Sequence, residues 1–208
     1  RTGERVAYAR PSAVGATVPD GVVGADNRNR GDYHEEAAGR RWRISAPSFF
    51  QARADGADAL ARIVTAAARP GDGRTAVDLY AGVGLFAGAL VDAGWTVTAV
   101  EGVKAAAADA RRNVPEARVV HADVASWRPA AFDLVVADPS RHGLGRAGTD
   151  VVAGTGAAAV LLVSCDPAAM GRDAGLLHDR GYRLESVTPV DLFPHTFHIE
   201  VISHWLRA

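Results

Sequence analysis

The chain has 208 residues, enough for one ordinary domain with a short appendage. Its composition, 48% hydrophobic and 23% charged, is that of a globular protein and excludes a largely disordered chain. A formal net charge of −1 excludes a generally polycationic nucleic-acid coat, although it is compatible with a local basic groove.

The single cysteine, Cys165, excludes an internal disulfide and any multi-cysteine metal or iron–sulfur site. The longest apolar stretch, residues 151–163, contains two glycines and is shorter than the ~20 residues that span a bilayer. The sequence shows no signal peptide or lipidation motif, so we expect a soluble cytoplasmic protein without membrane contact. Because the chain starts at Arg1 rather than Met, it is compatible with a piece of a longer protein.

Residues 1–47 differ in composition from the rest. They are rich in Pro, Gly and Asn and hold eight Arg against six Asp and Glu, a net charge of +2, which leaves −3 for the remainder. The alternation over residues 41–45 predicts small strands. We therefore expect an irregular or β-rich appendage over residues 1–47 and a main domain over residues 48–208.

Within the main domain, β-branched runs alternate with alanine-rich runs. The predicted helices are 54–68, 85–93, 105–113 and 167–180, and the predicted strands are 75–80, 96–101, 118–123, 132–138, 157–165, 182–190 and 198–206. Apolar strands separated by helices indicate a parallel sheet covered on both faces, and the last two strands indicate a final antiparallel hairpin. This α/β pattern resembles the class I methyltransferase fold, a Rossmann-like, seven-stranded, doubly wound sheet with its last strand antiparallel.

A glycine turn, DLYAGVG over residues 78–84, follows the first of these strands. Gly82 and Gly84 let the backbone approach a ligand closely at the start of a helix. Glu101 and Asp123 end the next two strands, where their carboxylates can serve ribose hydroxyls or an adenine amine. The spacing predicts an adenosine-containing cofactor; the alternative is that both acids only cap helices.

The fourth strand ends in DPSR, residues 138–141, at the topological switch where such sheets bind ligands. An Asp-Pro followed by Arg is not usual in nicotinamide enzymes. It resembles the D/N-P-P-x motif with which nucleic-acid methyltransferases hold a base or the methyl donor. The alternative for Asp138 is a turn-initiating residue.

Cys165 follows the fifth strand and directly precedes Asp166 and Pro167, which we expect to begin a helix. A helix N-terminus favours a thiolate and the neighbouring Asp166 opposes it. A lone cysteine is usually a small buried hydrophobe. Its place one strand from Asp138 nevertheless makes Cys165 a candidate nucleophile.

In the last segment, His198 and Glu200 face the same side of a predicted strand. Glu200 is a candidate general base beside the cysteine. A metal site formed by His195, His198, Glu200 and Cys165 matches no common ligand spacing, so we expect no metal.

Six segments in this order resemble the RNA 5-methyluridine (uracil-C5) methyltransferase family over about residues 42–206. They are SFFQ (48–51), DLYAGVG (78–84), VEG (100–102), DPSR (138–141), VSCDP (163–167) and FPHTFHIE (193–200). The resemblance implies that S-adenosylmethionine is held by Gln51, Tyr80, Glu101 and Asp138. It further implies that Cys165 adds to uracil C6 and that Glu200 accepts the C5 proton. The expected substrate is an unstacked uridine in tRNA or rRNA.

The sequence also departs from this family. Arg53 stands where the family commonly has Asn, and Ala81 where it often has Cys. Many members carry an N-terminal TRAM barrel, which we expect this sequence to lack. Some carry an iron–sulfur cluster, which the single cysteine excludes here. Residues 1–47 resemble the tail of the segment that links the barrel to the catalytic domain, so we expect feeble RNA binding by this chain.

Several side chains are candidates for RNA contacts. The aromatic candidates for stacking on the target base are Phe49, Phe50, His195 and Phe197, and for the two consecutive phenylalanines burial in the core is the stronger expectation. The basic candidates are Arg141, Arg146 and Arg172, with ordinary surface arginines as the alternative. Two other hypotheses stay open: a class I methyltransferase acting on another substrate, and a cofactor-binding module inactive without an RNA-binding domain.

Overall fold

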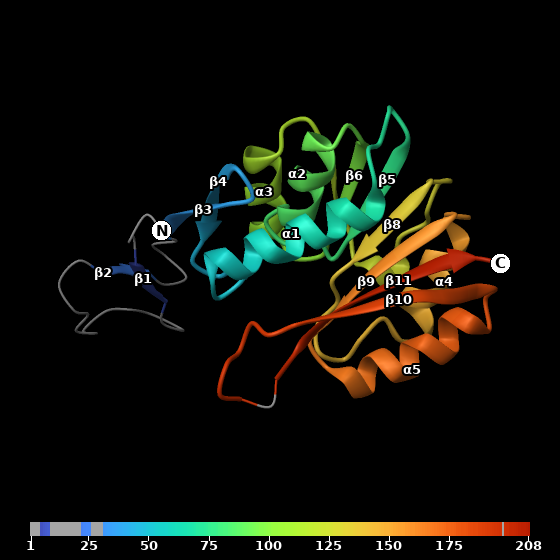
Figure 1. The fold of residues 1–208 in the computed structure, drawn as a ribbon. Helices are drawn as coiled ribbons and strands as arrows, with labels where there is room; N and C mark the ends of the chain where they lie inside the picture. The colour runs from blue at the N-terminus through green and yellow to red at the C-terminus, as the bar shows by residue number, and fades with distance from the viewer. Residues whose placement is uncertain (1–4, 9–21, 26–30, 197) are drawn as a thin grey trace.

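The computed structural model describes residues 5–8, 22–25, 31–196 and 198–208, and for the first two of these segments it describes the backbone alone. Strands β1 (Arg5–Tyr8) and β2 (Val22–Ala25) form a parallel pair. Strands β3 (Asp32–Ala37) and β4 (Arg40–Ser45) form an antiparallel hairpin (Figure 1). All four strands lie within residues 1–47, and the division of the chain at residue 47 stays a prediction.

The main sheet has seven strands in the order β10-β11-β9-β8-β5-β6-β7. They are β5 (Thr75–Leu79), β6 (Thr96–Glu101), β7 (Arg118–His121), β8 (Leu134–Ala137), β9 (Ala159–Ser164), β10 (Tyr182–Val190) and β11 (Glu200–Arg207). Strands β5 to β9 pair in parallel, whereas β11 lies antiparallel between β9 and β10. The expected doubly wound sheet with an antiparallel last strand is confirmed.

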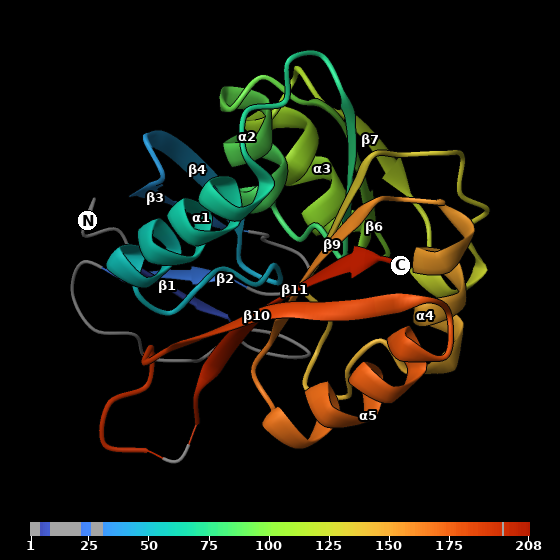
Figure 2. The ribbon, with the colours of Figure 1, turned by 45° about the vertical axis from the view of Figure 1, so that its right-hand side comes forward.

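Helices cover both faces of this sheet (Figures 1 and 2). Helices α1 (Ala54–Ala68), α2 (Leu85–Asp92) and α3 (Lys104–Asn113) lie on one face, and α4 (Gly145–Gly154) and α5 (Pro167–His178) on the other. A short 3₁₀ helix, Val124–Ser126, follows β7. In the part of the chain that the structure describes, no helix is both long and apolar enough to cross a membrane.

Alternate residues of the central strands pack into two separate cores. In β8, for example, Leu134 and Val136 belong to the core beneath α1 and α2, whereas Val135 and Ala137 belong to the core beneath α4 and α5. Successive side chains of a strand point to opposite faces, so a sheet covered on both sides needs an unbroken apolar run. This is why the strands of the sequence lack a polar alternation.

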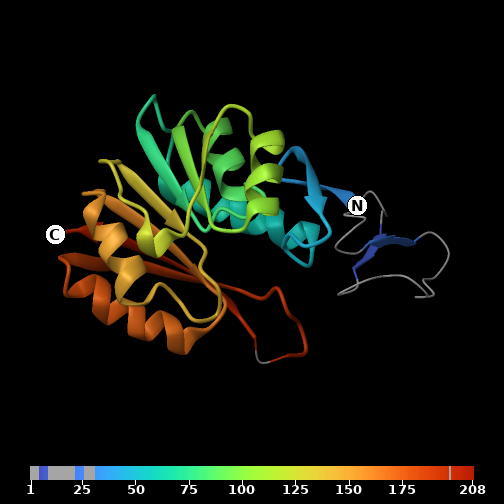
Figure 3. The same cartoon turned by 180° about the vertical axis from the view of Figure 1, so that it is seen from behind.

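The β3–β4 hairpin packs into the core beneath α1 and α2. Trp42 and Ile44 are fully buried there, and the Trp42 indole donates a hydrogen bond of 2.8 Å to the carbonyl of Ala37. Seen from behind, the hairpin lies beside α3 (Figure 3). Residues 31–47 therefore share a core with the main sheet.

Candidate active site

A cavity of about 550 Å³ opens at the carboxyl ends of the parallel strands, where the strand order reverses between β5 and β8. This is the position at which open α/β sheets bind ligands, and the volume is in the range of small-molecule sites. Eight residues predicted to act in catalysis or in binding of the cofactor or substrate line the cavity together: Gln51, Tyr80, Gly82, Glu101, Asp138, Arg141, Cys165 and Glu200.

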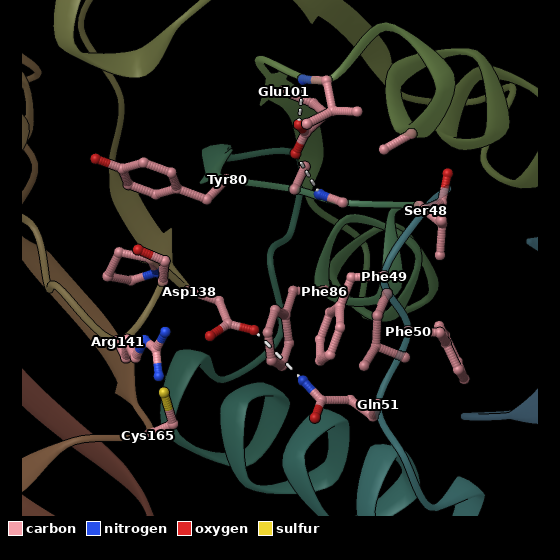
Figure 4. Close-up of a pocket in the computed structure, with 18 of the residues that line it drawn as sticks. Ser48, Phe49, Phe50, Gln51, Tyr80, Phe86, Glu101, Asp138, Arg141 and Cys165 are labelled. Atoms are coloured by element: carbon pink, nitrogen blue, oxygen red, sulfur yellow. Dashed lines mark hydrogen bonds between the residues drawn. The ribbon is translucent and has the colours of Figure 1, made fainter. Parts of the chain in front are cut away.

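The glycine turn and the end of β6 form one wall of the cavity. Gly82 has a positive φ of 56°, which suits glycine, and its N–H donates to Glu101 Oε2 at 2.8 Å. Glu101 Oε1 accepts from the N–H of Val103, at the start of α3, at 2.5 Å (Figure 4). Because a carboxylate has about four acceptor positions, Glu101 keeps capacity for hydroxyl groups in the cavity.

Gly84, Asp123 and His195 do not line the cavity. Gly84 precedes α2, and a Cβ there would lie 3.0 Å from a methyl group of Val114, so this glycine allows α2 and α3 to approach. Asp123 lies two residues beyond the end of β7 and caps the 3₁₀ helix by accepting the Ala125 N–H at 3.0 Å. His195 is exposed in the loop between β10 and β11. Ligand binding by these three residues stays a prediction.

Strand pairing brings Glu200 to Cys165. Val201 of β11 pairs with Ser164 of β9 in antiparallel register. The next position in this register places Glu200 opposite Cys165, although 35 residues separate them in the chain. Glu200 is 3% exposed, and both residues line the same cavity. The structure therefore brings the two side chains of the cysteine-and-base hypothesis to one cavity, and their catalytic roles stay a prediction.

Buried carboxyl groups control the electrostatics around the thiol. Burial raises the pKa of Glu200 from 4.5 to about 7. Burial, with Glu200 and Asp78 nearby, raises the pKa of Asp138 well above its usual range. Burial and the charges of Glu200 and Asp138 also raise the pKa of the Cys165 thiol. Asp166, expected from the sequence to oppose the effect of the helix N-terminus, also contributes to this rise in the pKa of the thiol.

Asp138 lies between the thiol and the segment that precedes α1. Figure 4 shows its carboxyl group between Cys165 and Gln51, whose amide donates to Asp138 Oδ2 at 3.5 Å. Gln51 and Asp138 are 87 residues apart in the sequence, so the fold joins two motifs that the sequence placed at the same site.

One buried acid in the glycine-turn motif was not among the predicted site residues. Asp78 is fully buried; its Oδ2 accepts from the N–H of Ala87 at 2.8 Å, and its Oδ1 has no partner among the described residues. Burial raises the pKa of Asp78 to about 8. Its position inside an apolar strand, Thr75–Leu79, is the sequence signal that could have identified it.

The aromatic predictions have mixed outcomes. Phe50 is buried and packs against Trp42 with ring centroids 6.2 Å apart, as expected. The expected burial of Phe49 is wrong: the side chain is 68% exposed and lines the cavity, because the extended segment turns its ring away from the core. Phe197 lies outside the described residues.

The basic side chains are also divided. Arg141 lines the cavity, whereas Arg146 and Arg172 are exposed on α4 and α5 and do not line it. Among the residues that the structure describes, no three His, Cys, Asp or Glu side chains form a group that could hold a metal ion.

Comparison with solved structures defines the fold class. The tRNA (uracil-54, C5)-methyltransferase of Pyrococcus abyssi, solved in complex with S-adenosyl-L-homocysteine, matches with a TM-score of 0.78 and 27% identity, over 89% of this chain and 50% of that one. Several other solved structures named as methyltransferases match at 15% to 20% identity. The chain therefore has the class I S-adenosylmethionine-dependent methyltransferase fold.

Curated relatives are named as RNA methyltransferases. An uncharacterized RNA methyltransferase of Streptomyces avermitilis is 37% identical over 179 residues, which cover 81% of this chain and 41% of that protein. A second uncharacterized RNA methyltransferase, from Streptomyces coelicolor, is 39% identical over 179 residues, which cover 81% of this chain and 39% of that protein. The chain thus spans about two fifths of the length of these relatives. No family model matches the sequence.

Proposed function

We propose that the chain is the catalytic part of an S-adenosylmethionine-dependent RNA methyltransferase that forms 5-methyluridine in tRNA or rRNA. The observation that carries this proposal is the shared cavity: Cys165 and Glu200 line the same space as the glycine turn and Glu101. The names of the curated relatives support RNA as the substrate. The Pyrococcus abyssi enzyme supports uracil C5 as the methylated atom.

The residues of the cavity fit S-adenosylmethionine, which would supply the methyl group. Glu101 ends β6 with free acceptor capacity for ribose hydroxyls, and the Gly82 turn leaves room for close backbone approach. Gln51, Tyr80 and Asp138 add further polar groups to the lining. The largely apolar remainder of the lining, including Phe86 and Val103, suits an adenine ring.

The protein side chains would divide the chemistry between them. Once deprotonated, Cys165 adds to C6 of the uracil, and C5 becomes the carbon of an enolate that can take a methyl group. Glu200 then accepts the C5 proton, for which a pKa of about 7 is suited. Loss of that proton lets the C6–sulfur bond break and restores the cysteine. The target uridine must leave its stack to reach this cavity.

A covalent-trapping experiment tests this assignment. Glu200→Gln should leave adduct formation intact but prevent its resolution, because the amide cannot accept the C5 proton. Incubated with RNA and S-adenosylmethionine, this variant should give a slow-migrating protein–RNA band on a denaturing gel. Adding Cys165→Ala to Glu200→Gln should abolish the band, and its persistence in the double variant would falsify the nucleophile assignment.

The partial coverage of the relatives favours one alternative: a module that binds the cofactor but needs further chain to engage RNA. Calorimetry with S-adenosylhomocysteine followed by a methylation assay with total RNA separates the two. Cofactor binding with methyl transfer supports the proposed enzyme, whereas cofactor binding without transfer supports the module.

A further inference from the structure

A buried carboxylate on α3 lies behind the wall of the cavity and does not line it. Asp109 is fully buried. Its two oxygens accept from the Ser45 N–H at 2.8 Å, the Ser45 hydroxyl at 2.8 Å and the Ser48 hydroxyl at 2.9 Å, and also from the guanidinium of Arg43. An ionised carboxylate out of contact with water is costly unless hydrogen-bonded, so these four donors account for its presence there.

The hydrogen bonds of Asp109 hold both ends of one turn. The Ser48 N–H donates to the Ser45 carbonyl at 2.7 Å, which closes the turn. A single oxygen, Asp109 Oδ2, accepts from the Ser45 N–H and from the Ser48 hydroxyl. The carboxylate therefore fixes where the chain leaves β4 and in which direction it continues.

The segment that leaves this turn forms part of the cavity wall. Ser48, Phe49 and Gln51 all line the cavity, and the amide of Gln51 meets Asp138 (Figure 4). Helix α3 itself contributes Ala106, one helical turn before Asp109 and on the same side of the helix. Helix α3 thus contributes Ala106 to the cavity wall, and its Asp109 holds the segment of residues 48–51 that forms another part of the wall.

We propose that Asp109 is a positioning residue of the cofactor site: through the Ser45–Ser48 turn, its carboxylate sets the position of Gln51 and Phe49. This inference rests on the proposed binding of S-adenosylmethionine. It requires that Asp109 act on the cofactor through Ser48 rather than through the stability of the whole domain.

A double-mutant cycle on the full chain tests this coupling. We expect Ser48→Ala and Asp109→Asn each to raise the dissociation constant for S-adenosylhomocysteine, measured by calorimetry, by roughly tenfold, as for loss of one charge-assisted hydrogen bond. In the Asp109→Asn background, Ser48→Ala should add little, because both changes break the same link. Additive effects, or unchanged affinities, would overturn the inference.

Arg40→Ala is the matched control. Arg40 lies on the same hairpin and bonds Asp92 at 2.7 Å and Glu116 at 3.3 Å, away from the cavity. The Arg40→Ala variant should have a lower melting temperature but an unchanged affinity for S-adenosylhomocysteine. A loss of affinity equal to that of Asp109→Asn would refute a specific role for Asp109. Should Asp109→Asn fail to fold, Ser48→Ala, which removes one half-buried hydroxyl, decides alone. If the wild-type protein binds no S-adenosylhomocysteine, both the proposed cofactor and this inference are overturned. If the wild type and both variants bind it with normal affinity, only this inference is overturned.

Discussion

Three buried carboxyl groups lie in or beside the cavity: Asp138 and Glu200 line it, and Asp78 lies inside strand β5. All three have a raised pKa, and in each the first cause is burial, which disfavours the charged form. Between their ordinary pKa values and the raised ones, the folded protein binds more protons than the unfolded chain. The contribution of each group to the free energy of unfolding is therefore fully present below the group's ordinary pKa. It is lost as the pH rises from that value through the raised pKa of the folded protein.

This linkage gives a prediction for Glu200, whose pKa rises from 4.5 to about 7. The wild-type protein should lose stability relative to Glu200→Gln as the pH increases from about 4.5 to about 7, because only the wild type must ionise a buried carboxyl group. Urea midpoints of both proteins, measured at pH 5 and pH 8, check this. The difference between the two proteins cancels the titrating groups that do not interact with Glu200, and an equal change in both midpoints would contradict the assignment.

At the scale of helices and strands, close packing decides where glycine is required. Gly88 lies in α2 against the hairpin, and a Cβ there would come 2.7 Å from the Trp42 ring. Gly175 lies in α5, and a Cβ there would meet nothing within 4 Å. Gly88 therefore permits close contact between α2 and the hairpin, whereas Gly175 only lowers the helix propensity of α5.

The two glycines should respond in opposite directions to alanine. Gly88→Ala should destabilise the protein by about 1–3 kcal/mol, because the Trp42 ring has to move in a packed core. Gly175→Ala should stabilise it by up to about 1 kcal/mol through helix propensity. Urea denaturation of the two variants measures both effects, and destabilisation by Gly175→Ala would show that α5 is packed differently.

The elements of the main sheet were largely predictable because their apolar runs are continuous. Helix α1 has the expected bounds, Ala54–Ala68, and the strands differ from expectation by a few residues at their ends. Helix α4 was missed, because its sequence contains three glycines and two valines and its helical state depends on packing. Its buried side includes Val151 and Val152, which lie in the core beneath α5.

The candidate site was predictable where its residues follow strands. Glu101 ends β6, and Asp138 and Cys165 directly follow β8 and β9; because these strands are parallel, their convergence follows from topology. The role of Asp109 in holding the Ser45–Ser48 turn was not predictable, because it depends on contacts between residues more than 60 positions apart. No local pattern in the sequence encodes such a contact.

For the whole molecule, the main consequence of the structure is that the β3–β4 hairpin belongs to the core. Trp42 and Ile44 are fully buried between the hairpin and the helices of the main sheet. The ion pairs of Arg40 with Asp92 and Glu116 fasten the hairpin from outside. The folding unit that contains the main sheet therefore includes residues 31–47.

Truncation tests this extent of the folding unit. A chain of residues 31–208 should retain cooperative urea unfolding and near-ultraviolet circular dichroism. A chain of residues 48–208 should lose at least about 3–5 kcal/mol, the usual cost of deleting one large buried aromatic side chain, since Trp42 and Ile44 both go. Equal urea midpoints for the two chains would contradict the structure of the core.

The insertion of β11 between β9 and β10 has a consequence for biosynthesis. Both neighbours of β11 precede it in the sequence, so β9 and β10 are synthesised before the strand that pairs with both of them. Until β11 is made, the backbone groups that face its position have no partner there. Only when residues 200–207 emerge does β11 fill this position and Glu200 reach Cys165. Until then β9 lacks its partner on one side, so we expect a chaperone that shields open strand edges to raise the yield of folded protein.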